Sequence, residues 1–176
     1  MTRWNIDADH SVAAFKVRHM MVALVRGQFN KLSGSVRFDP TGFSSFSLDL
    51  AIDAMGLYTG IVKRDQHLCS PDFFDVATYP AITFISTGFT VSREGGELAG
   101  DLTLHGVTRR VILEVGFSGP VVSPVDFGGE TALGITARTA INREDFGMVW
   151  NVPMIDGGVM VGRDIEIDLD IEADME

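Results

Sequence analysis

The chain has 176 residues and a mass of 19.1 kDa, which is the size of one folded domain, so we expect residues 1–176 to form a single domain. Hydrophobic residues make up 45% of it and charged residues 22%, which excludes a disordered or collagen-like protein. The net charge is −10, and Lys occurs only at positions 16, 31 and 63, so we expect no nucleic-acid partner.

Alternation of apolar and polar residues predicts β-strands along most of the chain. In chain order, the predicted strands cover residues 3–8, 11–19, 27–39, 46–53, 81–91, 97–104, 111–117, 133–141 and 165–172. The last is the most regular, because its apolar residues alternate with acidic ones. Between Phe29 and Leu32 the apolar phase slips by one residue, which predicts a β-bulge.

Two segments depart from this alternation, residues 19–26 and 60–76, and both are predicted as short helices. Turn-forming residues separate the strands at positions 39–42, 94–96, 119–120, 128–129 and 157–158. A sheet of this size avoids exposed edges when it closes on itself. We therefore expect an all-β fold, an antiparallel β-barrel of about eight strands with one or two short helices.

Cys69 is the one cysteine, which excludes an internal disulfide and any CxxC motif for metal or redox chemistry. The N-terminal residues contain no apolar run typical of a signal peptide, and no stretch reaches the roughly 18 to 20 apolar residues of a membrane span. We therefore expect a soluble, cytoplasmic protein, or a periplasmic one if the sequence has been trimmed of an export signal.

The motifs of common catalytic sites are absent from the sequence: it has no GxSxG, HExxH, GxGxxG or phosphate-binding GxxxxGK[ST]. The four histidines do not pair at metal-ligand spacing, and Asp65 with His67 falls short of the three or four ligands of a closed site. We therefore expect no metal and no cofactor.

Of 16 aromatic residues, 12 are Phe, and rings without a polar tip suit a dry interior. For any single ring, filling of the core is the simpler interpretation. A closed barrel of about eight strands can instead enclose a small ligand, and an apolar lining selects an apolar one.

Two irregular segments contain both charged and aromatic residues. Residues 64–75 form either a plug at one barrel end or the rim of a pocket, where Arg64 or His67 would face a polar head group. Residues 142–148 form either a ligand contact or a turn, in which an Arg contacts carbonyl groups and Gly147 is left-handed.

Four blocks of sequence resemble the YceI-like family of polyisoprenoid-binding proteins: WNIDADHSVAAFKVRHM, RDQHLCSPDFFDVATYPAITF, GDLTLHGVTRRVIL and INREDFGMVWN. The resemblance covers residues 4 to about 172. It implies an extended, lipocalin-like antiparallel barrel, usually a homodimer. In such a barrel the internal channel holds a long apolar chain, such as a polyisoprenoid, an isoprenoid quinone or a fatty-acid derivative.

The resemblance also implies which residues matter, by their match to positions that recur in the family. Together with the ring of Phe84, these positions give the predicted ligand-binding set: His10, Phe15, His19, Phe29, Arg64, Asp65, His67, Phe73, Phe74, Phe84, Asn142, Arg143 and Phe146.

Three functions remain open at this point. The first is a carrier or storage protein for a long-chain isoprenoid or other lipid, which is not an enzyme. The second is an enzyme acting on an amphipathic substrate, with Asp65, His67 or His19 as acid or base. The third is a filled barrel that acts only as a dimerising partner protein.

Overall fold

The computed structural model describes residues 1–39, 45–92, 95–125, 128–155 and 157–176. The strands are β1 (Thr2–His19), β2 (Ala23–Phe29), β3 (Leu32–Phe38), β4 (Phe46–Asp53), β5 (Leu57–Tyr58), β6 (Ala81–Ser92), β7 (Gly95–Leu104), β8 (Val107–Val122), β9 (Thr131–Asn142) and β10 (Val161–Met175). Helix α1 covers Val62–Cys69, and short 3-10 helices cover Ala54–Gly56 and Arg143–Phe146. No helix among the described residues is long and apolar enough to cross a membrane.

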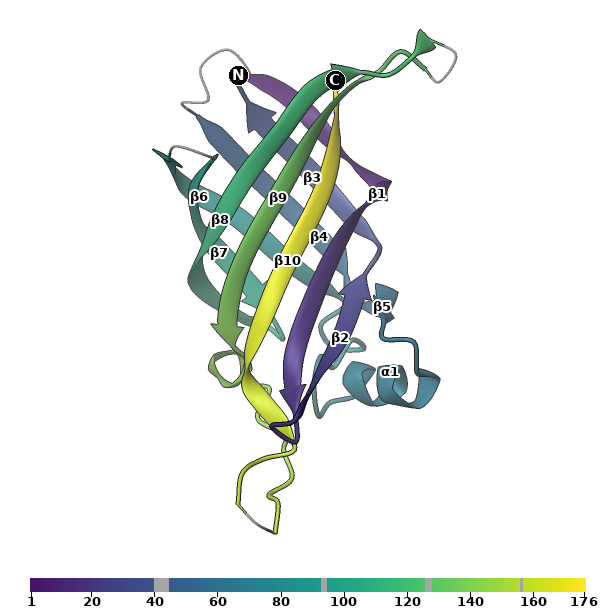
Figure 1. Ribbon diagram of the computed structural model, residues 1–176, viewed down its shortest axis with the longest axis vertical. Helices are drawn as coiled ribbons and strands as arrows, with labels where there is room; N and C mark the ends of the chain where they lie inside the picture. The colour runs from purple at the N-terminus through teal and green to yellow at the C-terminus, as the bar shows by residue number, and fades with distance from the viewer. Residues whose placement is uncertain (40–44, 93–94, 126–127, 156) are drawn as a thin grey trace.

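The strands form one antiparallel sheet that closes on itself. The order is β10-β9-β8-β7-β6-β4-β3-β1, and β1 also pairs with β10, which makes a closed barrel of eight strands. Strand β2 pairs with residues 13–19 of β1, and β5 in turn pairs with β2. Figure 1 shows the tall barrel, with α1 beside β2 and β5 near the end opposite the two termini. The predicted fold class is confirmed.

Strand β1 is longer than predicted and faces two shorter strands. The predicted strands at residues 3–8 and 11–19 form one strand, in which the register against β10 shifts between Asp7 and Val12. Opposite it, residues 2–5 pair with β3 and residues 13–19 with β2. The predicted strand at 27–39 is therefore two strands, and the phase slip after Phe29 is a break between them, not a bulge.

The prediction of a helix at residues 19–26 is wrong. Met20 and Met21 have positive φ angles of 50° and 62° and form a hairpin turn, after which β2 begins at Ala23. Backbone pairing of Ala23 with His19 and of the following residues along β1 replaces the hydrogen bonds a helix would have made. The helix predicted within residues 60–76 is confirmed at Val62–Cys69.

Of the five predicted turns, two are present, one is wrong and two lie partly outside the described residues. Gly128 and Gly157 lie in hydrogen-bonded turns. Residues 119–120 instead lie inside β8, where the register against β9 shifts between Ser118 and Val121, so this predicted turn is wrong. A Gly-Pro pair interrupts ladder pairing without ending the strand. Residues 40–42 and residue 94 of the other two predicted turns lie outside the described residues.

Inward-facing side chains divide the interior into two parts. Near the end with both termini, Phe38, Phe46, Phe89 and Phe117 pack with ring centroids 4.9 to 6.3 Å apart, and we call this part the closed half. The opposite part, beside α1, is the α1 half (Figure 1). Because aromatic rings fill the closed half, any space for a ligand is confined to the α1 half.

Candidate functional site

The α1 half encloses a cavity of about 120 Å³. Apart from Thr83, Thr139 and Arg143, every residue that lines it is apolar. Its walls come from β1, β2, β4, β6 to β10 and the residues that follow α1. An apolar void of this kind stays dry and accepts apolar groups, so the cavity suits a hydrocarbon chain.

Three rings form one wall of the cavity. The ring centroids of Phe15, Phe29 and Phe74 lie 5.3 to 6.3 Å apart. The ring of Phe15 lies directly over Gly27, where a Cβ atom would collide with it and would come within 2.8 Å of Thr59 Cγ2. Glycine at position 27 therefore lets this ring lie flat on β2 and leaves the cavity open.

A groove of about 410 Å³ adjoins the cavity. It lies between the paired ends of β1 and β2, helix α1, and the residues Trp150, Met160 and Val161. Five apolar residues line both spaces, Phe15, Val17, Leu68, Phe73 and Val161. The groove and the cavity therefore share a wall.

Helix α1 brings basic side chains to this groove. Lys63 and His67 are four residues apart and so lie on the same helix face, with Arg64 beside them. Arg64 donates from Nε to Thr59 Oγ1 and from Nη2 to Thr59 O, both at 2.7 Å. Asp65 accepts from the backbone N–H of Thr59 at 3.0 Å and from its hydroxyl. Thr59 therefore fixes both charged side chains.

His67 lies in an aromatic corner at the mouth of the groove. Its Nε2 is 2.8 Å from Asp72 Oδ2. Its ring meets Phe73 and Trp150 edge-on, with centroids 5.1 and 4.8 Å apart. His67 thus pairs with Asp72 and not with Asp65.

Arg143 holds the loop between β9 and β10. Its side chain is 2% exposed, and it donates to Gly162 O at 2.9 Å, to Val161 O at 3.4 Å and to Met148 O. Burial lowers the pKa of this guanidinium below its ordinary value. The turn predicted for residues 142–148 is confirmed, because Gly147 ends the 3-10 helix with a left-handed φ of 81°.

The predicted ligand-binding residues fall into three groups. Those in the cavity wall are Phe15, Phe29, Phe73, Phe74, Phe84 and Arg143. Those in the groove wall are His19, Arg64 and His67, again with Phe15 and Phe73. Those in neither wall are His10, Asp65, Asn142 and Phe146. For all three groups, contact with a ligand stays a prediction.

Sequence reasoning missed Arg18, Lys63 and Trp150, which line the groove. The spacing of Lys63 from His67 was a usable signal, since residues at i and i+4 share a helix face. Arg18 and Trp150 carried no comparable signal, because three distant segments form the groove.

The sequence matches the YceI-like domain over residues 4–173. This chain belongs to the YceI-like family. A UPF0312 protein of Staphylococcus aureus strain MSSA476 is 33% identical over 172 residues, which cover 98% of this chain and 97% of the relative. The family predicted from the four sequence blocks is confirmed.

Solved structures of similar proteins share the fold of this YceI-like protein. A YceI protein of Campylobacter jejuni has a TM-score of 0.75 and 27% identity over 90% of each chain. BcnA of Burkholderia cenocepacia has a TM-score of 0.79 and 21% identity over 95% of this chain and 98% of its own. A polyisoprenoid binding domain from Saccharophagus degradans has a TM-score of 0.71 and 17% identity over 100% of both. The last two show the fold alone.

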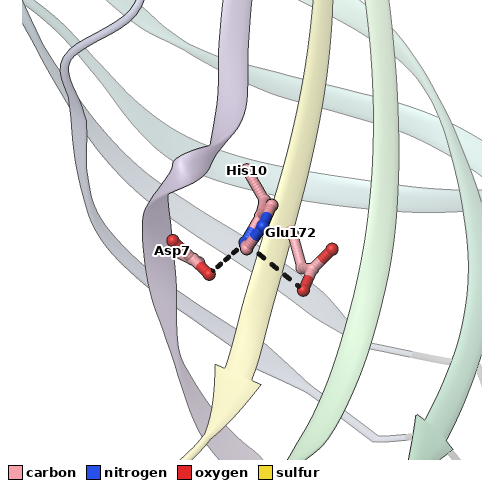
Figure 2. Close-up of side chains that lie close together, drawn as sticks. All are labelled: Asp7, His10 and Glu172. Atoms are coloured by element: carbon pink, nitrogen blue, oxygen red, sulfur yellow. Dashed lines mark hydrogen bonds and ion pairs between the residues drawn. The ribbon is translucent and has the colours of Figure 1, made fainter. Parts of the chain in front are cut away.

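A second group of titratable side chains lies on the outer surface of the YceI-like barrel, at the register shift in β1 (Figure 2). His10 Nδ1 is 2.6 Å from Asp7 Oδ2 and 4.0 Å from Glu172 Oε1. Because an ionised carboxylate only accepts, Nδ1–H donates to Asp7. This bond holds the pKa of Asp7 below its ordinary 3.8 and raises that of His10 above 6.5.

The three side chains of this group could offer a cation one nitrogen and two oxygens, all within 4.8 Å of one another. These three ligands, of which His10 is exposed and the two carboxylates are half-buried, are fewer than the four of a closed zinc site. Both carboxylates also lie nearest to the same atom, His10 Nδ1, and this nitrogen already donates its hydrogen to Asp7. An ion pair explains the group without a metal.

Substitution of Asp7 by Asn is expected to return the pKa of His10 toward 6.5, measured by NMR titration of the imidazole. Asp9→Asn is the control, because Asp9 raises the pKa of His10 only weakly. An unchanged pKa of His10 in Asp7→Asn would contradict the pairing. In the wild type, the contribution of Asp7 to stability is lost as the pH falls through its lowered pKa, and that of His10 as the pH rises through its raised pKa.

Proposed function

We propose that this YceI-like protein binds the long apolar chain of a lipid, with part of the chain in the cavity and the polar head in the groove, and that it carries or stores the lipid. The observation that carries the proposal is the apolar cavity in the α1 half, which adjoins an open groove with basic residues. A barrel that served only as a partner surface would need no such space.

The volumes indicate how a ligand would lie. An engineered cavity of about 150 Å³ holds a benzene-sized group, so about 120 Å³ accommodates a short piece of chain. The rest of a long tail would lie along the apolar side of the groove, over Leu68 and Phe73. Each methylene buried there contributes about 0.8 kcal/mol, so affinity grows with chain length.

The chemistry of the walls favours several related ligands. Polyisoprenoids, isoprenoid quinones and fatty-acid derivatives all present a long apolar chain with one polar end. The fold shared with the polyisoprenoid binding domain of Saccharophagus degradans supports this class. An apolar wall discriminates by length and bulk, so the head group must be selected by the side chains of the groove.

The geometry favours binding over catalysis. Asp65 bonds to Thr59, His67 bonds to Asp72, and Asp65 lies outside the walls of both spaces. A general acid or base has to reach the substrate within hydrogen-bond distance, directly or through one water. Of the three candidate acid–base residues, Asp65 is therefore not placed to act on a ligand, His67 is engaged by Asp72, and His19 and His67 line the groove.

The test is to extract the purified native protein with organic solvent and identify co-purified lipids by mass spectrometry. Ala13→Leu adds three carbon atoms to the cavity wall and is expected to lower the amount of retained lipid severalfold. Ala140→Leu makes the same change on the exposed outer face of β9 and is expected to retain lipid as the wild type does. Equal retention by both variants, or no lipid in any preparation from lipid-rich cells, would contradict the proposal.

A further inference from the structure

The walls of the groove combine apolar residues with an unusual set of charges. Five side chains that carry or can carry positive charge line it: Arg18, His19, Lys63, Arg64 and His67. No Asp or Glu among the described residues does so, although the whole chain has a net charge of −10. A groove lined by basic side chains, on a protein of net negative charge, is a local feature that the overall composition does not explain.

Three of these charges have no ion-pair partner within the described parts of the protein. There, Arg18, Lys63 and Arg64 have no carboxylate at ion-pair distance. Asp72 pairs with His67, and Asp65 accepts from the same Thr59 that holds Arg64. The groove therefore keeps at least three positive charges available for a ligand.

Arg64 is also held in a fixed position. Its bonds to Thr59 use Nε and one hydrogen of Nη2, and no described residue accepts from Nη1. A guanidinium fixed in this way loses little side-chain entropy when it binds a carboxylate or phosphate. Lys63 from α1 and Arg18 from the end of β1 add two further charges to the same groove.

From these observations we propose that the lipid bound by this protein carries an anionic head group, a carboxylate or a phosphate, which lies in the groove against Arg64, Lys63 and Arg18. The inference rests on the proposed function, because the apolar chain of the same molecule occupies the adjoining cavity. The acidic surface elsewhere on the protein repels such a head group, so it has one favourable place to bind.

The experiment compares ligands that share a chain and differ in charge. Oleate is paired with oleyl alcohol, and farnesyl monophosphate with farnesol, and each is titrated into full-length protein freed of co-purified lipid. Binding is read from Trp fluorescence, because Trp150 lies in the groove wall. The charged member of at least one pair is expected to bind about tenfold more tightly, and added salt is expected to reduce the difference.

Two double variants test whether the preference for charged ligands arises in the groove. Arg18→Gln with Lys63→Gln is expected to reduce the preference to about twofold, while binding of the alcohols stays unchanged. Arg37→Gln with Arg110→Gln removes two equally exposed charges outside the groove and is expected to preserve it.

The possible results separate the charge of the head group from the binding of the lipid chain. A preference in one pair only identifies carboxylate or phosphate as the head group. Equal affinities within both pairs, or a preference that the control variant loses to the same extent, would overturn the anionic head group and leave the proposed function standing. Failure of all four ligands to bind would instead remove the proposed function, and this inference with it.

Discussion

The Arg143→Met substitution is expected to lower the free energy of unfolding by roughly 3 kcal/mol or more. The guanidinium donates to the carbonyl groups of Met148, Val161 and Gly162, and it is almost fully buried. Val161 O also accepts from Asn151 Nδ2 at 2.7 Å, so the substitution removes this donor from the carbonyls of Met148 and Gly162 without such a replacement. Each buried carbonyl left without a donor costs about 1 to 3 kcal/mol. Urea denaturation of the variant and the wild type measures the difference.

The neighbouring Arg163→Met is the matched control. Arg163 is exposed and pairs with Glu144 at 3.3 Å, so its loss is expected to cost less than about 1 kcal/mol. Val161, which accepts from Arg143, lines the groove with Trp150 and Met160, so Arg143→Met is also expected to weaken lipid retention. Similar unfolding free energies for the two variants would show that Arg143 does not hold this loop.

The Phe38→Ala substitution is expected to be as damaging, with a loss of about 3 to 5 kcal/mol. Phe38 is 0% exposed, and its ring lies 4.9 Å from that of Phe117 and 6.3 Å from that of Phe46. Removal of the ring leaves a void in the closed half that close-packed neighbours cannot fill. Thermal or urea unfolding gives the loss directly.

Two comparisons make this result specific. Phe38→Leu keeps most of the apolar volume and is expected to cost clearly less than Phe38→Ala. Ile85→Ala, on the exposed face of β6, is expected to stay within about 0.5 kcal/mol of the wild type. Lipid retention per folded molecule should survive in all three, because the cavity lies in the α1 half. A loss below about 1 kcal/mol for Phe38→Ala would mean that the closed half is loosely packed.

Most of the barrel could be predicted from the sequence, because a strand with one face inside alternates every second residue. In β4, for example, Phe46, Leu48 and Leu50 are buried while Asp49 between them is exposed. Residues 23–26 of strand β2 were predicted as helix because Leu24 and Val25 are adjacent apolar residues without a period of two. Their conformation is decided by pairing with β1, a contact that local sequence does not encode.

The candidate site was predictable only in its parts. The rings, Arg64 and His67 stood out by type, but β1, α1 and the segment residues Trp150, Met160 and Val161 had to be brought together by the fold before they made a groove. The partner of His67 is Asp72 and not Asp65, because the turn after α1 carries Asp72 back toward the helix. The filling of the closed half was also not predictable, since alternation identifies an inner face without showing whether side chains meet across it.

The most direct test of lipid binding is a crystal structure with a bromine-labelled chain, such as 9,10-dibromostearate, in which anomalous scattering locates the bromine atoms. We predict bromine among Phe15, Phe74 and Leu113 in the α1 half, with the carboxylate in the groove beside α1. Bromine found only on the outer surface of the barrel, or an interior without bromine in crystals saturated with the ligand, would contradict a lipid site inside this protein.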